Sequence, residues 1–260
     1  MARQFARSMR TYNAAAIVQQ ETAEHLIGMI HRAVGPAQPR NVLELGCGTG
    51  LLTAFLVREF PIQHLVLNDL LQNVTTLARR RARGRSAIRV ELRLGDMECI
   101  ELPMNQDLVA SNAVLQWAGD PIAMLHRMQS AVKPNGLLAL ATFGPENLRE
   151  TRALTGCSLH YPPLRTIQRE LALESEVLES HEQHRTVYFE SAFAVLQHLK
   201  RTGVNSLASE RWSPRAVKAF CNLYEFHFRR EEQVPLTYHP MLIIARRRGT
   251  AASARVEGSR

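Results

Sequence analysis

Three glycines at alternate positions, Gly46, Gly48 and Gly50, directly follow the apolar run at residues 42–45. Apolar residues of helical type resume at Leu51, so the spacing predicts a strand, a tight turn and a helix. Glycine suits a turn that needs a positive φ or a close approach of a ligand to the backbone, and the start of the next helix offers unpaired N–H groups. Ordinary strand-to-helix turns also carry glycine, so these residues alone are weak evidence for a ligand site.

Three further strand-like runs each end in a polar residue that could contact a ligand. Asp69 ends the second run, about twenty residues beyond the glycines, where nucleotide-binding units place a carboxylate for ribose hydroxyls. Asp96 follows the third run and Asn112 follows the fourth. Because the carboxyl ends of parallel strands meet at one edge of a sheet, we expect these side chains and Glu44 to surround one crevice.

Two classes of nucleotide cofactor are compatible with this crevice, the nicotinamide dinucleotides and S-adenosylmethionine. The dinucleotide fingerprint is G-x-G-x-x-G, whereas this chain has its glycines at positions 46, 48 and 50, after the acidic Glu44. Together with Asp69 and the pair Gly95 and Asp96, the pattern resembles that of the class I methyltransferases. The motif therefore favours S-adenosylmethionine over a dinucleotide.

The composition is that of a folded protein with neither a disulfide framework nor a zinc motif. Of the 260 residues, 45% are hydrophobic, and the four cysteines stand far apart with no CxxC pair. This cysteine usage favours a reducing cytoplasm. The formal net charge of +8 favours acidic partners and says nothing about the fold. No apolar stretch approaches the length of a membrane-spanning helix, so we expect no membrane segment.

Two other clusters could indicate different ligands. His181 and His184 stand three residues apart, but their segment is predicted to be extended, which would point the two rings to opposite faces, so we expect no metal site. Arginines crowd residues 79–85 on a predicted helix, without interleaved aromatic side chains. A solvated helix face explains this cluster better than a nucleic-acid interface.

Alternating strand and helix patterns predict an α/β fold with a doubly wound, Rossmann-like parallel sheet. We divide the chain into N-terminal helices (1–40), a cofactor-binding core (41–143), a substrate-side cap with the final strands of the core (144–248) and a disordered tail (249–260). The cap includes helical patterns at 191–201 and 213–229, which form an insertion before the last strand. The expected core strands are 42–45, 65–67, 88–94, 107–110, 137–143 and 241–245, and the expected core helices are 49–59, 70–83 and 121–132.

Beyond the cofactor motif, the chain resembles the malonyl-acyl carrier protein O-methyltransferase family of biotin synthesis. The glycines and aspartates are shared by many methyltransferases and indicate only the cofactor. The pair Gln116 and Trp117, the stretch 199–203 and the stretch 236–239 are more particular, and their occurrence in this order carries the resemblance. The matching segments cover nearly the whole chain: 3–12, 43–50, 68–70, 95–98, 111–117, 142–144, 147–150, 196–204 and 235–239.

The resemblance implies a role for each residue of the crevice. The glycine backbone would approach the methionine part of S-adenosylmethionine, and Glu44 would orient this turn or bind the cofactor's ammonium group. Asp69 would accept hydrogen bonds from both ribose hydroxyls, and Asp96 would accept from the adenine amino group. The expected cofactor-binding residues are Glu44, Gly46, Gly48, Gly50, Asp69, Leu70, Asp96, Met97 and Asn112. The product would be S-adenosylhomocysteine.

The implied substrate is a malonyl group on an acyl carrier protein, methylated on its free carboxylate. This carboxylate is ionised near neutrality and is its own nucleophile, so no general base is required. An arginine fork and a tyrosine hydroxyl would recognise it, and Arg149 and Tyr238 are the candidates. Tyr12 would close over the cofactor as part of a helical lid, although a core aromatic of the same helix is an equal alternative.

Three functions stay open at this point. The first is the malonyl thioester O-methyltransferase, and the second is an O-methyltransferase for another small carboxylic acid. The third is a binding protein that has lost turnover, against which the intact glycines and aspartates argue. We further expect a cytoplasmic monomer with an acyl carrier protein as its partner, and neither nucleic acid nor a membrane.

Overall fold

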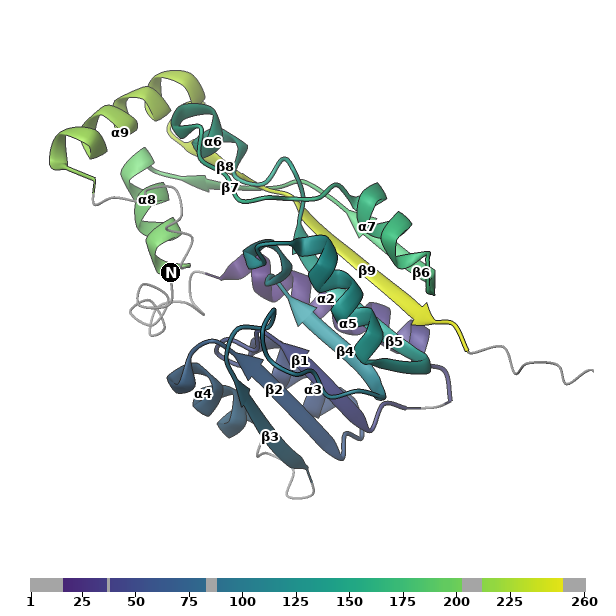
Figure 1. Cartoon of the computed structure of the whole chain (residues 1–260). Helices are drawn as coiled ribbons and strands as arrows, with labels where there is room; N and C mark the ends of the chain where they lie inside the picture. The colour runs from purple at the N-terminus through teal and green to yellow at the C-terminus, as the bar shows by residue number, and fades with distance from the viewer. Residues whose placement is uncertain (1–15, 37, 83–87, 203–211, 250–260) are drawn as a thin grey trace, which may run out of the picture.

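A seven-stranded sheet forms the centre of the computed structural model, which describes residues 16–36, 38–82, 88–202 and 212–249 (Figure 1). The strand order is β3-β2-β1-β4-β5-β9-β6, and a separate two-stranded sheet pairs β7 with β8. The strands are β1 (Asn41–Leu45), β2 (His64–Asp69), β3 (Arg89–Leu94), β4 (Gln106–Asn112), β5 (Val132–Phe143), β6 (Ser175–Glu182), β7 (Arg185–Phe189), β8 (Val234–Tyr238) and β9 (Pro240–Arg247). The predicted α/β class with a doubly wound sheet is confirmed.

Strand direction departs from the prediction at one edge of the sheet. Strands β1 to β5 are parallel, as expected, but β9 runs antiparallel to both β5 and β6. Phe143 at the end of β5 pairs with Pro240 at the start of β9. The chain therefore returns to the sheet at the edge where β5 left it, and it must run in the opposite direction. A uniformly parallel sheet was the wrong expectation.

Helices cover both faces of this sheet (Figure 1). On one face, Leu26 of α2 and Leu56 of α3 pack with Val42 and Leu108 of the sheet in one apolar cluster, which α4 joins. The other face carries a second cluster formed with α5 and α7. The helices are α2 (Ile17–Val34), α3 (Leu51–Glu59), α4 (Gln72–Ala82), the 3₁₀ turn η1 (Leu115–Trp117), α5 (Pro121–Ala131), α6 (Arg149–Thr155), α7 (Leu164–Leu171), α8 (Ala192–Arg201) and α9 (Pro214–Phe228).

Local sequence explains where several of these elements begin. Asp120 caps α5 by accepting hydrogen bonds from the backbone N–H groups of Ile122 and Ala123, and Pro121 occupies the first helical position. Ser191 caps α8 in the same way. Strand β5 is longer than the predicted strand at 137–143, because it begins at Val132.

The cap lies beyond the carboxyl ends of β1, β4 and β5 and contains α6, α8, α9 and the small sheet of β7 and β8 (Figure 1). Its own apolar cluster includes Val195, Tyr224 and Leu236, and Phe143 at the end of β5 joins this cluster to the core. The predicted helices at 191–201 and 213–229 are present as α8 and α9. The segment of His181 and His184, which we expected to be extended, runs from β6, which extends the main sheet, to β7, which belongs to the cap.

Some expectations concern residues outside the described part of the chain. These are the lid helix with Tyr12, part of the arginine cluster at 83–85 and the tail at 250–260. Among the helices of the described residues, none has the length and apolar character needed to cross a membrane.

Candidate cofactor and substrate site

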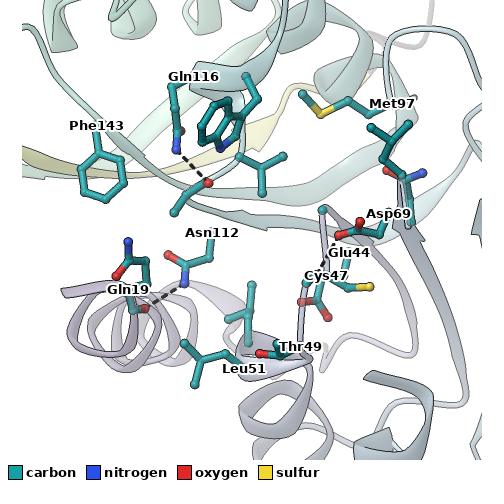
Figure 2. A pocket seen from close by; sticks show the side chains of 18 of the residues that line it. Gln19, Glu44, Cys47, Thr49, Leu51, Asp69, Met97, Asn112, Gln116 and Phe143 are labelled. Carbon is teal, nitrogen blue, oxygen red and sulfur yellow. Dashed lines mark hydrogen bonds between the residues drawn. The ribbon is translucent and has the colours of Figure 1, made fainter. Parts of the chain in front are cut away.

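A cavity of about 410 Å³ lies at the carboxyl ends of the central strands. Its walls come from the turns that follow β1, β2, β3 and β4, and from the cap above them. Figure 2 shows Glu44, Asp69, Met97 and Asn112 around this space. Four strand ends therefore meet at one crevice, as the sequence predicted.

The glycine turn follows β1 and has a left-handed backbone, with φ of 63° at Gly46, 52° at Gly48 and 80° at Gly50. Gly46 and Gly48 line the cavity. A Cβ atom at Gly46 would lie 2.3 Å from the side chain of Val114, so no larger residue fits there. Gly50 is not among the lining residues, and a Cβ atom there would lie 2.6 Å from the Cα of Ala78. Gly50 thus allows α4 to pack closely against the start of α3.

Glu44 reaches the cavity from the buried strand β1. Its side chain is only 2% exposed, and one carboxyl oxygen accepts a hydrogen bond of 2.6 Å from the Thr53 hydroxyl. Burial raises the pKa of Glu44 to about 8, and the Thr53 hydrogen bond offsets part of this rise. The carboxyl group is therefore mostly protonated near neutrality in the ligand-free protein. A cation placed beside it would favour its ionised form.

Asp69 ties the end of β2 to the glycine turn. Its Oδ2 atom accepts from the Gly48 N–H at 2.9 Å, and its Oδ1 atom accepts from the Leu71 N–H at 3.0 Å. Burial raises the pKa of Asp69, and the backbone hydrogen bonds oppose this rise. Each carboxylate oxygen has a second acceptor site, so two hydroxyl donors can still be bound.

The turn after β3 forms another wall. Asp96 and Met97 both line the cavity, and the exposed Asp96 carboxylate accepts a hydrogen bond from the Glu98 N–H at 3.0 Å. Leu70 also lines the cavity, with 55% of its surface exposed. An apolar rim beside a carboxylate that can accept from an amino group suits a purine base.

Asn112 connects β4 to helix α2. Its Oδ1 atom accepts from the Thr22 hydroxyl at 2.9 Å. Its Nδ2 atom donates to the Gln19 carbonyl at the same distance, as Figure 2 shows. Gln19 itself lines the cavity. This pair of hydrogen bonds fixes α2 beside the cavity at the end of β4.

The cap supplies the remaining wall, where the substrate is expected. Tyr238 at the end of β8 lines the cavity, and its hydroxyl oxygen lies 2.7 Å from Nε2 of His198. Burial lowers the pKa of His198 to about 4, with a further contribution from Arg201, so this imidazole is neutral near pH 7. Arg149 is not among the lining residues. Its side chain is 51% exposed, with Nε 3.4 Å from a carboxylate oxygen of Glu150.

The two histidines considered for a metal pair face different neighbours. The ring of His181 lies 5.0 Å from the ring of His25, whereas His184 stacks on His239 at 4.5 Å. The two rings are therefore separated, and His184 lies between β6 and β7 rather than on the same strand as His181.

Comparisons with known proteins agree with this geometry. The methyltransferase domain family matches residues 42–136. A malonyl-[acyl-carrier protein] O-methyltransferase of Haemophilus ducreyi is 36% identical over 94% of this chain and 95% of its own length. The chain belongs to the malonyl-[acyl-carrier protein] O-methyltransferase family. A Chlorobium phaeovibrioides member is also 36% identical, over 94% of both chains.

Solved structures support the fold assignment of this methyltransferase family. The N-methyltransferase NodS of Bradyrhizobium japonicum, in complex with S-adenosyl-L-homocysteine, superposes with a TM-score of 0.53 at 14% identity, over 86% of each chain. The class I methyltransferase fold and the family resemblance predicted from the sequence are both confirmed.

Several lining residues were not singled out by sequence reasoning within this family pattern. They include Gln19, Cys47, Asn147, Leu159, Tyr161 and Thr202. Gln116 and Trp117 also line the cavity, and they had been used only as markers of the resemblance. Gln19 lies on the helix before the motif and Tyr161 in a segment without regular structure, so neither follows a strand end. No local signal in the sequence marks them.

Proposed function

We propose that this chain transfers a methyl group from S-adenosylmethionine to the free carboxylate of a malonyl group carried by an acyl carrier protein. The products are the malonyl methyl ester and S-adenosylhomocysteine. Masking the charged end lets the acyl chain be elongated as an ordinary fatty acid toward the pimeloyl precursor of biotin. The observation that carries the proposal is the cavity bounded by Glu44, Asp69 and Asp96, in a chain that belongs to this family.

The residues of the cavity fit the cofactor by their chemistry. Asp69 has acceptor sites for the two ribose hydroxyls, and Asp96 can accept from the adenine amino group. The raised pKa of Glu44 lets its buried carboxyl group ionise when an ammonium group is bound nearby. When bound, S-adenosylmethionine supplies a methyl group activated by a sulfonium centre.

The protein's contribution to the reaction is positioning. The malonyl carboxylate is ionised near neutrality and attacks directly, so this chain has no proton to remove. Its residues must hold the carboxylate oxygen in line with the methyl group and exclude water, which supplies the orientational part of catalysis. Asn112 and helix α2 close one side of this space, and the cap closes the other.

A single experiment tests the activity directly. The purified chain is incubated with isotopically methyl-labelled S-adenosylmethionine and either malonyl-acyl carrier protein or free dicarboxylic acids, and the products are analysed by mass spectrometry. We expect label on the malonyl carrier, as one methyl ester. Label on a free acid instead would assign the chain to another small carboxylic acid, and no label on any acceptor would refute methyl transfer to a carboxylate.

Arg149 is part of this proposal as a group that attracts the substrate carboxylate. Arg149→Ala should lower kcat/KM for the malonyl carrier roughly ten-fold or more, and leave cofactor affinity in isothermal titration unchanged. Arg169→Ala is the matched control, because Arg169 is also exposed and also lies beside an adjacent glutamate. An equal loss of cofactor affinity and turnover would remove Arg149 from this role.

Tyr12 as a lid residue, the carrier protein as partner, and a monomeric cytoplasmic protein remain proposals of the same kind. The role of Tyr12 can be tested by the affinity for S-adenosylhomocysteine. If the aromatic ring closes over the cofactor, Tyr12→Ala should weaken this affinity more than Tyr12→Phe, which removes only the hydroxyl.

A further inference from the structure

Tyr161 lies in the wall of the cavity on the side of the cap. It belongs to the irregular segment between α6 and α7, and its hydroxyl is bound by the side chain of Asn147 at 3.0 Å. Asn147 follows β5, is only 4% exposed and also lines the cavity. The pair therefore joins the end of the central sheet to the substrate wall.

The backbone of His239 fixes the orientation of the Asn147 amide. The His239 N–H lies 3.2 Å from Oδ1 of Asn147. Because a backbone N–H can only donate, the amide oxygen must face His239 and the amide nitrogen must face Tyr161. Asn147 thus donates to Tyr161, and the Tyr161 oxygen is the acceptor in that contact.

This arrangement limits where the Tyr161 proton can point. An oxygen that accepts from Asn147 must direct its own O–H elsewhere. Among the described residues, no acceptor for this O–H is recorded, and the ring borders the cavity. Burial raises the pKa of Tyr161, so the hydroxyl keeps its proton throughout the range of ordinary assays. The hydroxyl therefore has a proton to donate, on a residue that lines the cavity.

Tyr238, the tyrosine considered from the sequence, is placed differently. Its hydroxyl lies against the neutral His198, whose Nε2 can either donate or accept according to the tautomer. The contact of Tyr238 therefore depends on the His198 tautomer, whereas the role of Tyr161 as an acceptor from Asn147 follows from the backbone N–H of His239.

We propose that Tyr161 donates a hydrogen bond to the malonyl carboxylate, through the oxygen that is not methylated, and that Asn147 is the positioning residue for this donor. The inference rests on the proposed function. A donor on one oxygen orients the carboxylate and leaves the other oxygen as the nucleophile. The positive charge of nearby Arg152, which contributes to the field at the Tyr161 hydroxyl, favours an anion here.

The first test is Tyr161→Phe, which removes only the hydroxyl. With S-adenosylhomocysteine bound, affinity is measured for malonyl-acyl carrier protein and for acetyl-acyl carrier protein, which differ only in the carboxylate. We expect the variant to lose roughly 10- to 100-fold in malonyl affinity and little in acetyl affinity, as for a hydrogen bond to a charged group. Affinity for S-adenosylhomocysteine and the unfolding temperature should stay near those of the unmodified protein. Tyr188→Phe, at an exposed position on β7, is the control.

The second test is Asn147→Asp, made alone and together with Tyr161→Phe. A carboxylate at 147 can still accept from His239 but would accept from Tyr161 as well, which would turn the Tyr161 proton away from the substrate. If Asn147 acts through Tyr161, the aspartate should weaken malonyl affinity less in the Tyr161→Phe background.

The outcomes separate this inference from the proposed function. Normal turnover by the unmodified protein with unchanged malonyl affinity in Tyr161→Phe overturns the inference alone, as does an equal loss for the malonyl and acetyl carriers. Selective malonyl loss in Tyr161→Phe, in a protein that never methylates the carrier, supports the inference and refutes the proposed function. Failure of the unmodified protein to bind the malonyl carrier refutes both.

Discussion

Glu44 places an ionisable group in the cofactor wall and makes stability depend on pH. Its ordinary pKa is 4.5, and burial raises it to about 8 in the folded protein. The folded state therefore holds this proton more tightly than the unfolded state, so the free energy of unfolding should fall as pH rises from about 4.5 to about 8. Between pH 6.5 and 8, the ionisation of Glu44 should lower the free energy of unfolding by about 2 kcal/mol.

The variant Glu44→Gln should remove this contribution, because it does not ionise. In urea unfolding of the ligand-free protein, the unmodified chain should lose more stability between pH 6.5 and 8 than the variant does. Glu24→Gln, on the exposed side of α2, should keep the slope of the unmodified protein. Identical slopes for all three proteins would show that Glu44 is ionised in the fold.

Gly46 tests whether the glycine turn is required for its backbone or for its lack of a side chain. Gly46→Ala adds a methyl group 2.3 Å from the Val114 side chain at a φ of 63°. Gly156→Ala is a matched control, because Gly156 has a φ of 66° and open space around it. The control should lose only about 1 kcal/mol of stability, the cost of a left-handed backbone at alanine. Gly46→Ala should lose more stability and should also bind S-adenosylhomocysteine more weakly.

A compensating variant completes the test of Gly46. Val114→Ala removes the methyl groups that the new Cβ would meet, so it should restore part of the stability lost in Gly46→Ala. Urea unfolding measures stability, and isothermal titration measures cofactor affinity. Equal losses in the two glycine variants would mean that the turn relaxes and that Val114 sets no limit.

At the scale of elements, Glu150 holds two parts of the cap together, helix α6 and strand β8. Its buried carboxylate, at the start of α6, accepts from the Thr237 N–H at 2.9 Å and from the Thr237 hydroxyl at 2.5 Å. Thr237 precedes Tyr238 on β8, so this clamp positions a residue of the substrate wall. Glu150→Ala leaves a buried N–H without its acceptor and should cost about 1 to 3 kcal/mol of stability.

The expected functional effect of Glu150→Ala is confined to the substrate. KM for the malonyl carrier should rise, and affinity for S-adenosylhomocysteine should stay near normal, because the glycine turn and Asp69 lie on other elements. Thr237→Ser, which keeps both donors, is the control for the same pair of groups. Parallel losses of cofactor and substrate affinity would contradict a clamp that acts only on the cap.

The elements that sequence reasoning predicted are those with strong local patterns. The strands of the core are apolar runs that end in polar residues, and α8 and α9 combine amphipathic spacing with a serine cap. Helices α6 and α7, with only 7 and 8 residues, were missed, although the apolar residues of α7 at 164, 167 and 171 have helical spacing. The antiparallel β9 was missed because strand direction depends on where the chain returns, which no local pattern records.

The cofactor side of the site could likewise be predicted from local patterns, whereas the substrate side could not. Glu44, Asp69, Asp96 and Asn112 follow directly from their positions at strand ends. The substrate wall depends on contacts between distant residues, such as the hydrogen bond between Asn147 and the backbone of His239, 92 positions apart. Two residues of this wall were predicted from their residue type and the family resemblance. Tyr238 lines the cavity, whereas Arg149 lies on an exposed surface and is not among the lining residues.

At the scale of the whole molecule, part of the net charge of +8 is concentrated on helix α4 beside the cavity. Arg79, Arg80 and Arg81 are exposed on α4, and none of them forms an ion pair with an acid in the described part of the chain. Helix α4 packs against the glycine turn at Gly50, and Leu70, just before this helix, lies on the rim of the cavity. Unpaired cations in this position can attract an acidic carrier protein.

Replacing these three arginines by glutamate should raise KM for the malonyl carrier several-fold. KM for malonyl-pantetheine should stay unchanged, because this small thioester has no protein surface that could dock on α4.

The carrier reaction of the unmodified protein should also slow as salt is added, and the variant should show a weaker salt dependence, since screening acts on exposed charges. Reversal of Arg165 and Arg169, which are exposed on α7 and do not line the cavity, is the control. If both variants behave alike, the net charge of the protein attracts the carrier and α4 is not its docking surface. If neither variant alters KM, docking does not depend on these arginines.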